Sequence, residues 1–294
     1  MNIALCTDEK YSFPCGVCVT SILENNKEEE CNIYIIANKL SHITIEKFKE
    51  LQRKYRQKVE VILVSDNAFD GLKICDRFPK SIYYRFLLPQ LLLNEEKVIY
   101  LDCDIIITNS LRQLWETNID DLACGVIEDQ RSDDIRIQNR LELYKKYFNS
   151  GVLLINLDYW RKEKTANKLI EFIYKNPDIC VLPDQDALNY ILHDKVKFLE
   201  YKYNYQELFY LPVKETFLHK SKWKNLIPRE EIPVVIHYTQ GTKPWITTCN
   251  HPHKHLFYKY QAISPWSKNK IKSPYSIKGK IAVIIKQIVR IIKL

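Results

Sequence analysis

The stretch KVIYLDCDIII, from Lys97 to Ile107, combines an apolar run with two closely spaced acids. It is apolar up to Leu101, breaks at Asp102 and Asp104, and returns to three isoleucines. This pattern predicts a buried strand with two carboxylates at its carboxyl end. Burying an unpaired carboxylate costs several kcal/mol, and a divalent cation held by oxygen ligands would offset that cost. The stretch therefore predicts a metal site.

Apolar runs alternate with helical patterns on both sides of this stretch. The predicted strands are Asn2–Thr7, Asn32–Ala37, Val59–Val64, Val98–Leu101, Leu122–Ile127, Phe148–Leu157, Val196–Tyr201 and Val234–Tyr238. The predicted helices are Phe13–Leu23, Ser41–Tyr55, Ser81–Leu93, Leu111–Trp115, Tyr159–Tyr174 and one that begins at Pro183. The polar, amphipathic stretch Ile135–Lys146 is interpreted as a mobile flap. This alternation predicts an α/β fold, a Rossmann-like and mostly parallel sheet with helices on both faces. Ligands of such sheets bind beyond the carboxyl ends of the strands.

Positive charge is concentrated toward the C-terminal end of the 294-residue chain. The sequence has 44 Lys and Arg and 36 Asp and Glu, a net charge of +8. No acid follows Glu231, whereas eleven Lys and Arg do, so residues 1–231 carry 33 basic and 36 acidic groups. A local basic segment favours an anionic partner, either a membrane surface or a nucleic acid.

The last fifteen residues, Lys280–Leu294, form an amphipathic pattern. One helical side is isoleucine, and Lys286, Arg290 and Lys293 lie on the other. We therefore predict that residues 264–294 form a basic amphipathic segment that associates with an anionic membrane surface, too short and too charged to span it. No nucleic acid is predicted, because the second face is apolar. The alternative is a helix that docks on the core.

Nine cysteines, an odd number, are scattered through apolar runs. No signal peptide pattern precedes the first strand, and no run of about 20 apolar residues is present. These features predict a cytoplasmic protein with buried, reduced thiols. The CxxC spacing of Cys15 and Cys18 lacks a matching second pair, so a redox or zinc role is disfavoured.

Further polar residues follow other predicted strands. His237 ends an apolar strand, as Asp102 does, and Gly241 and Lys243 come shortly afterwards. Two carboxylates and an imidazole suit Mn²⁺ or Mg²⁺, although a lone histidine is more often a satisfied core group. Gly241 permits close approach of the backbone to a phosphate, and Lys243 adds positive charge. Together these groups would stabilise a leaving diphosphate.

Two residues have alternative interpretations. Tyr11 follows the first predicted strand and could stack on a nucleobase, or it could pack at the entry of a helix. Arg85 is the only charge in an apolar helical pattern, so it requires an anion. That anion is either a phosphate of a ligand or a carboxylate of the metal site itself. Neither a Walker A loop nor a GxGxxG turn is present, so ATP hydrolysis and hydride transfer are not indicated.

Five motifs occur in one order: Thr7-Asp8-x-x-Tyr11, Tyr100-Leu101-Asp102-Cys103-Asp104, FNSGVLLINL from Phe148, Asp184-Gln185-Asp186-x-x-Asn189, and His237-Tyr238-x-x-x-x-Lys243-Pro244-Trp245. From about Asn2 to Trp266 the chain resembles glycosyltransferase family 8, closest to the bacterial lipopolysaccharide and lipooligosaccharide α-galactosyl- and α-glucosyltransferases. The resemblance implies a GT-A fold and retaining transfer from a UDP-hexose. It implies a catalytic domain over residues 1–263, with a donor half at about 1–105 and an acceptor half at about 106–263.

The resemblance also implies roles for individual residues. The expected metal ligands are Asp102, Asp104 and His237. The expected nucleotide-sugar contacts are Cys6, Thr7, Asp8 and Tyr11 at the uridine, Gly241 and Lys243 at the diphosphate, and Arg85, Asp102, Asp129, Asn149, Asp184 and Gln185 around the sugar. Cys103, between the two acids, is also counted among the expected nucleotide-sugar contacts, as a small buried side chain without a redox role. The chain departs from the family pattern at Gln240, where glycine is usual, and at Lys10, where asparagine is frequent.

The chemistry expected of the sugar site is retention. An amide such as Gln185 is a poor nucleophile and would stabilise an oxocarbenium-like centre, while the departing phosphate takes the proton of the acceptor. Asp184 or Asp129 is the alternative nucleophile. The expected donors are UDP-glucose or UDP-galactose, and the expected acceptor is a lipid-linked glycan such as lipopolysaccharide at the cytoplasmic face of the inner membrane. The alternatives are a glycogenin-like or protein-acceptor transferase, or a UDP-sugar binding protein without turnover.

Overall fold

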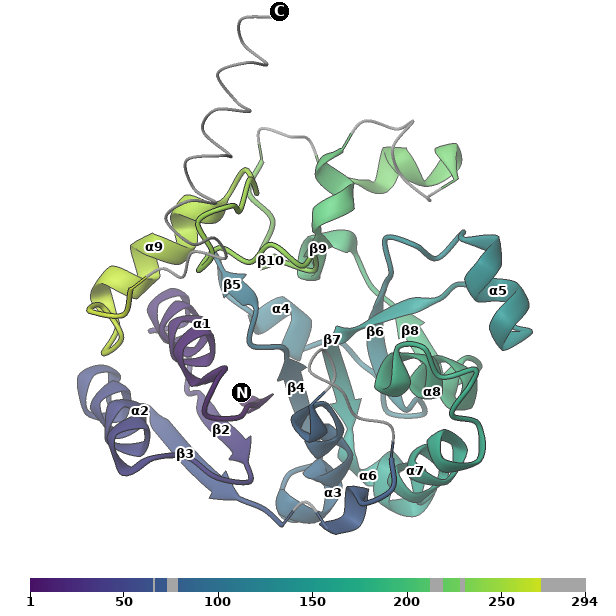
Figure 1. Cartoon of the computed structure of the whole chain (residues 1–294), viewed down its shortest axis with the longest axis horizontal. Coiled ribbons are helices and arrows are strands. Elements are labelled where there is room, and N and C mark those ends of the chain that lie inside the picture. Colours follow the sequence, from purple (N-terminus) through teal and green to yellow (C-terminus); the bar gives the residue numbers. More distant parts are fainter. Residues whose placement is uncertain (66, 73–78, 212–218, 228–230, 271–294) are drawn as a thin grey trace, which may run out of the picture.

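The computed structural model describes residues 1–65, 67–72, 79–211, 219–227 and 231–270 (Figure 1). Within these residues a seven-stranded sheet has the order β3-β2-β1-β4-β7-β6-β8. Its strands are β1 (Asn2–Cys6), β2 (Asn32–Ala37), β3 (Lys58–Leu63), β4 (Lys97–Leu101), β6 (Cys124–Glu128), β7 (Phe148–Asn156) and β8 (Val196–Phe198). All neighbours pair in parallel except β7, which is antiparallel to β4 and β6. The predicted α/β fold with a mostly parallel sheet is confirmed.

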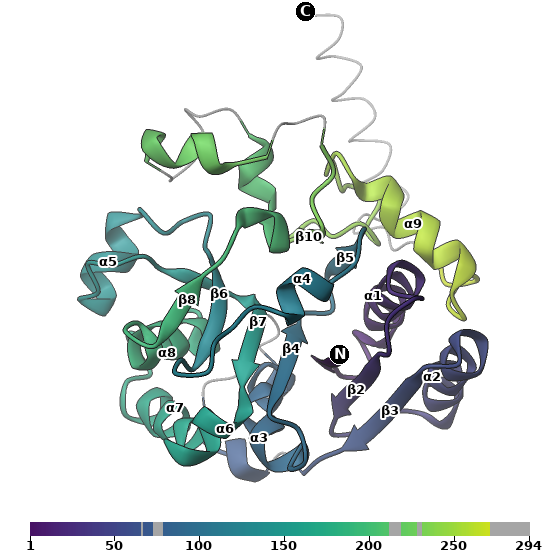
Figure 2. The ribbon, with the colours of Figure 1, turned by 180° about the vertical axis from the view of Figure 1, so that it is seen from behind.

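Helices cover both faces of this sheet because successive side chains of the buried strands point to opposite sides. Ile3 and Leu5 of β1 pack with one group of helices, α1 (Ser12–Asn25), α2 (His42–Tyr55), α4 (Arg112–Trp115) and α9 (Lys254–Ile263). Ala4 and Cys6 pack with the other group, α3 (Leu88–Leu91), α6 (Leu157–Lys162), α7 (Thr165–Lys175) and α8 (Pro183–Leu192). Seen from behind, α9 lies beside α1 (Figure 2). A shorter helix, α5 (Ile135–Leu141), precedes β7.

Two predicted helices differ from those observed. The stretch predicted as one helix over 81–93 is a 3₁₀ helix, Lys80–Leu87, followed by the four residues of α3. Pro89 has no amide hydrogen to donate to the carbonyl of Arg85, and Leu88 donates there instead. The helix predicted over 159–174 is divided into α6 and α7, because Lys164 adopts a left-handed backbone with φ 51°.

A second, three-stranded sheet contains β5 (Ile105–Ile107), β10 (Val235–His237) and β9 (Tyr205–Gln206). Strand β10 is antiparallel to β5, with His237 opposite Ile105, and parallel to β9. His237 ends a strand, as predicted, and that strand belongs to this second sheet. His237 still reaches the two acids, because β5 begins directly after Asp104.

The segment predicted to associate with membranes begins against the core. Trp266 is buried, with its ring 5.0 Å from that of Phe48. A Cβ atom at Gly16 would lie 2.2 Å from the Trp266 ring, so α1 has glycine where the indole crosses it. The amphipathic stretch Lys280–Leu294 lies outside the described residues. Among the helices that the structure describes, none has the length and apolar character needed to cross a membrane.

Candidate active site

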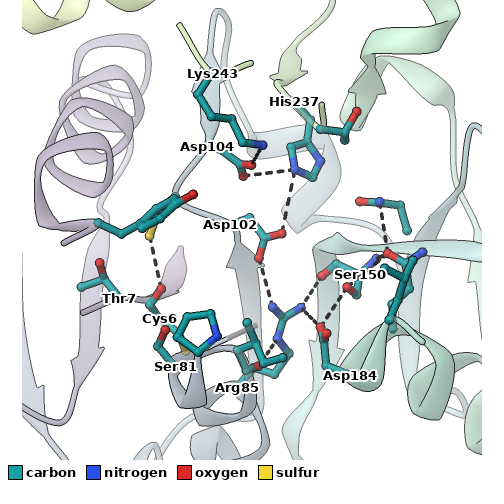
Figure 3. A pocket seen from close by; sticks show the side chains of 18 of the residues that line it. Cys6, Thr7, Ser81, Arg85, Asp102, Asp104, Ser150, Asp184, His237 and Lys243 are labelled. Carbon is teal, nitrogen blue, oxygen red and sulfur yellow. Dashed lines mark hydrogen bonds and ion pairs between the residues drawn. The ribbon is translucent and has the colours of Figure 1, made fainter. Parts of the chain in front are cut away.

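A pocket of about 710 Å³ opens beyond the carboxyl ends of β1 and β4 (Figure 3). Because β7 runs antiparallel to β4, the beginning of β7 and not its end reaches this edge, which brings Asn149 and Ser150 to the pocket. Most of the predicted site residues line it: Cys6, Thr7, Tyr11, Arg85, Asp102, Cys103, Asp104, Asn149, Asp184, Gln185, His237, Gly241 and Lys243. Residues from all five sequence motifs therefore meet at one pocket.

Two predicted residues do not line the pocket. Asp8 turns back on its own loop, where its Oδ1 accepts a hydrogen bond of 2.9 Å from the amide of Tyr11. Asp129 lies behind the lining residues and accepts hydrogen bonds from the side-chain amides of Asn149 and Gln185. Burial raises the pKa of the Asp129 carboxyl, and these hydrogen bonds oppose that shift. Both acids thus support neighbouring residues that face the pocket.

The predicted metal ligands come together in the described part of the chain. One ligand atom each from Asp102, Asp104 and His237 can be chosen so that all lie within 4.8 Å of one another. Nε2 of His237 is 3.2 Å from Oδ1 of Asp104 and 3.8 Å from Oδ2 of Asp102. Carboxylate oxygens with one imidazole nitrogen fit Mn²⁺ or Mg²⁺. The residues present therefore suit the cation that the sequence predicted.

The space that these three side chains share depends on Gly151. A Cβ atom at this position would lie 2.2 Å from Cε1 of His237 and 2.8 Å from Oδ2 of Asp102. Gly151 lies within the FNSGVLLINL motif, which by itself gives this glycine no function. Its importance depends on a tertiary contact, because nothing in the local sequence shows that a histidine 86 positions later packs over this glycine.

We expect Gly151→Ala to lower kcat/KM for glycosyl transfer by about 100-fold, because the added methyl group displaces His237 by about 1 Å. Steady-state rates of nucleotide release measure this effect. Gly125→Ala is a matched control in the neighbouring strand β6, where the nearest atom is the end of the Leu199 side chain at 3.1 Å. Equal losses in both variants would show that strand stability, and not the position of His237, causes the effect.

Lys243 and His237 both face Asp104. The Lys243 ammonium is 2.6 Å from Oδ2 of Asp104 and also donates to the carbonyl of Tyr238. Burial alone would raise the pKa of Asp104, but the adjacent ammonium of Lys243 opposes this, and that pKa lies well below its usual range. Asp104 is therefore an ionised carboxylate, as a metal ligand must be.

Arg85 occupies the base of the pocket and is 3% exposed. Its guanidinium group is 3.1 Å from Oδ1 of Asp102 and 3.2 Å from Oδ2 of Asp184, and it donates to the carbonyl of Ser150 at 2.7 Å. Of the two anions considered for Arg85, the structure therefore contains the carboxylate of the metal site, with a second acid beside it. These contacts connect Asp102 to the acids and amides at the start of α8.

Tyr100 was not among the predicted site residues. Its ring centroid is 4.2 Å from the guanidinium carbon of Arg85, and its hydroxyl donates to Oδ1 of Asp102 at 2.7 Å. In a strand the side chains of Tyr100 and Asp102 lie on the same side, and this period of two was the available signal. Tyr100 thus restrains both members of the Arg85–Asp102 pair.

Gln185 and Asp184 begin α8 and face the start of β7. Oε1 of Gln185 accepts from the amide of Ser150 at 3.0 Å and from Nδ2 of Asn149 at 3.2 Å. Oδ2 of Asp184 accepts from the Ser150 hydroxyl at 3.1 Å. Burial raises the pKa of Asp184 and the charge of Asp102 adds to this, whereas Arg85 opposes it. Both candidate catalytic side chains are therefore held by fixed donors.

Aromatic residues form the opposite wall of the pocket. The ring of Tyr11 is 40% exposed and meets Trp245 edge to face, with the centroids 5.8 Å apart. Burial, together with nearby acids of which Asp104 is the strongest, raises the pKa of Tyr11 to about 12. A neutral, partly exposed ring beside the pocket fits the interpretation of Tyr11 as a stacking surface better than that of a packed helix-entry residue.

This arrangement of two acids, a histidine and a lysine in one α/β pocket agrees with the sequence comparison. The model of the family described as "Glycosyl transferase family 8" matches residues 2–249. The chain belongs to glycosyltransferase family 8. The prediction that it is a glycosyltransferase enzyme is confirmed by this membership.

Several curated proteins match almost the whole chain. General stress protein A of Bacillus subtilis is 30% identical over 274 residues, which cover 91% of this chain and 95% of that protein. Lipopolysaccharide 1,2-glucosyltransferase of Escherichia coli is 31% identical, over 90% of this chain and 79% of that protein. Lipopolysaccharide 1,3-galactosyltransferase of Salmonella typhimurium is 27% identical, over 93% and 81%.

Among solved structures, the galactosyltransferase LgtC in complex with donor and acceptor sugar analogues has a similar fold. The TM-score is 0.81 at 23% identity, and the match covers 90% of this chain and 96% of that one. The shared architecture confirms the predicted GT-A fold of this family 8 member.

Proposed function

We propose that this chain is a retaining hexosyltransferase that moves glucose or galactose from a UDP-sugar to a hydroxyl of a lipid-linked bacterial glycan of the lipopolysaccharide type. The observation that carries the proposal is the group of Asp102, Asp104 and His237 beside Lys243 in a pocket of about 710 Å³. That volume suits a ligand of nucleotide-sugar size. The glucosyl- and galactosyltransferases among the curated relatives support a hexose donor and a lipopolysaccharide acceptor.

In the proposed site, different residues contact different parts of the donor. Asp102, Asp104 and His237 would hold Mn²⁺ or Mg²⁺, which when bound supplies positive charge to the diphosphate. Lys243 would bind phosphate oxygens together with the open backbone at Gly241, where an added Cβ atom would meet none of the described residues within 4 Å. Cys6, Thr7 and Tyr11 line the wall proposed for uridine. The hexose would contact the remaining pocket residues, which are Arg85, Asn149, Asp184 and Gln185. Asp8 and Asp129 would hold neighbouring residues that face the pocket.

We infer that Gln185 stabilises charge and does not attack the sugar. Its carbonyl oxygen already accepts hydrogen bonds from Ser150 and Asn149, which engage the lone pairs that a nucleophile would need. Asp184, the alternative nucleophile, is ion-paired with Arg85. Asp129 is separated from the pocket by Gln185 and Asn149. A fixed amide dipole can stabilise positive charge at the anomeric carbon while the leaving phosphate accepts the proton of the acceptor.

We expect Gln185→Ala to lower kcat by about 100-fold while the donor KM changes far less, since the amide acts where charge develops. Initial rates over a range of UDP-sugar concentrations separate the two constants. Gln261→Ala serves as the control, because this buried glutamine on α9 donates to the carbonyl of Asn269, away from the pocket. An unchanged kcat in the Gln185→Ala enzyme would remove Gln185 from the mechanism.

The donor and the turnover can be tested together. UDP-glucose, UDP-galactose and other UDP-sugars are supplied with Mn²⁺, with and without truncated lipooligosaccharide, and products are identified by mass spectrometry. Transfer of one hexose to the glycolipid is the expected result. Self-glycosylation or transfer to a protein would favour a glycogenin-like activity, whereas UDP binding without any UDP-sugar cleavage would favour a binding protein.

We also propose that residues 1–263 form the catalytic domain and that residues 264–294 bring it to the cytoplasmic face of the inner membrane as a peripheral protein. The support is the charge pattern, since eleven Lys and Arg and no acid follow Glu231. Sedimentation with anionic liposomes tests this proposal. Full binding by a chain that lacks residues 279–294 would contradict it.

A further inference from the structure

A row of buried amides leads from the proposed metal site to the proposed sugar site. Asn204 lies between the 3₁₀ helix Tyr201–Tyr203 and β9, and its side chain is 0% exposed. Its Oδ1 is 2.9 Å from Nδ1 of His237, and its Nδ2 donates to Oδ1 of Asn149 at 2.9 Å. Asn204 therefore connects His237, a candidate metal ligand, to Asn149, whose amide lines the pocket. Asn204 lies outside the five sequence motifs.

The proton positions in this row follow from one backbone group. The amide N–H of Gly151 donates to the side-chain atom Oδ1 of Asn149 at 3.0 Å. A backbone N–H is always a donor, so the Asn149 atom that faces it must be the oxygen. The Asn204 atom that faces the same oxygen must then be its NH₂ group, which leaves the oxygen of Asn204 toward His237.

An oxygen that faces Nδ1 of His237 requires the proton of a neutral imidazole to be on that nitrogen. Nε2 then carries the lone pair, and Nε2 is the atom that faces Asp104 at 3.2 Å and Asp102 at 3.8 Å. The opposite tautomer would direct an N–H group at the position of a cation. The backbone amide of Gly151 thus determines, through two asparagines, which nitrogen of His237 can act as a ligand.

We propose that Asn204 is a positioning residue that fixes the tautomer and the ring orientation of His237 and thereby sets the affinity of the site for a divalent cation. This inference rests on the proposed function in one respect: both require that a divalent cation binds at this site. The row continues past the metal site, because Nδ2 of Asn149 donates to Asp129 at 3.0 Å and to Gln185 at 3.2 Å. Asn204 therefore also restrains the amide that contacts Gln185.

Asn204→Ala tests the proposal. Loss of such an orienting partner typically weakens metal binding by about 10- to 100-fold, and we expect the dissociation constant for Mn²⁺ to rise by that factor. The measurement is electron paramagnetic resonance of free Mn²⁺ in a titration without sugar nucleotide. Asn26→Ala is the matched control, because Asn26 is also buried and its side chain also makes two hydrogen bonds away from the pocket, donating to the carbonyl of Ile22 and accepting from the amide of Leu111.

A second variant distinguishes the effect of Asn204 on His237 from its effect on Asn149. Asn204→Asp keeps an oxygen for the N–H of His237 but places its other oxygen against Oδ1 of Asn149. We expect Mn²⁺ binding at least as tight as in the unmodified chain, with a lower kcat because the contact to Asn149 is lost. The melting temperature of each metal-free variant monitors folding.

Several outcomes would overturn the proposal. These are unchanged Mn²⁺ affinity in Asn204→Ala, equal losses in Asn204→Ala and Asn26→Ala, or a loss in Asn204→Asp as large as that in Asn204→Ala. Absence of Mn²⁺ and Mg²⁺ binding to the unmodified chain would overturn it as well. A chain whose Mn²⁺ affinity depends on Asn204 but which transfers no hexose would refute the proposed function and leave this inference intact.

Discussion

Asp104→Asn is expected to lower kcat/KM for hexose transfer by about 1,000-fold, the upper end of the effect of removing one preorganised charge-stabilising group. The substitution removes a carboxylate that faces both His237 and the ammonium of Lys243. A neutral amide is a weaker ligand for Mn²⁺ and leaves Lys243 without its counter-charge. Initial rates at several Mn²⁺ concentrations measure the loss and show how much of it excess metal restores.

Asp194→Asn provides the control for Asp104→Asn. Asp194 is an exposed acid whose ion pairs, with Lys145 and His193, lie on the surface. Exposed pairs of this kind contribute about 0–1 kcal/mol, so the activity of this variant should be close to that of the unmodified enzyme. Near-normal transfer by Asp104→Asn at low Mn²⁺ would contradict the assignment of the metal site.

Arg85→Leu is expected to lower the free energy of unfolding by about 3–5 kcal/mol, because it leaves the buried acid Asp184 and the partly buried acid Asp102 without their shared cation. Urea denaturation followed by circular dichroism measures the change. Arg112→Leu removes an exposed arginine that pairs with Glu116 on the surface, and it should change stability by less than about 1 kcal/mol.

Arg85→Lys separates charge from geometry. Arg85 reaches Asp102 with Nη2, and it reaches both Asp184 and the carbonyl of Ser150 with Nη1 of the same planar group, and a single ammonium cannot reproduce that fork. We expect Arg85→Lys to regain part of the stability but little of the activity. Full activity in the lysine variant would show that only the charge at the base of the pocket is required.

The success of the sequence prediction differs between residues for physical reasons. Asp102 and Asp104 were found because two acids after a buried strand require an explanation within the local sequence. Tyr100 was missed although it precedes Asp102 by two residues, since its apolar neighbours gave it the appearance of a core residue. Asn204 was missed because its partners His237 and Asn149 are distant in the chain, and an isolated asparagine carries no signal of its own.

The sequence by itself determined most of the strands and helices, the acids at their ends and the family to which the chain belongs, because these depend on hydrophobic period and on motif order. Only the tertiary structure decided how the acids at Asp102 and Asp104 acquire their partners. The antiparallel insertion of β7 brings Gly151 to the carboxyl edge, and the pairing of β10 with β5 places His237 over it. Both contacts join residues far apart in the chain, and such pairings are selected by the packing of the whole sheet and not by local propensity.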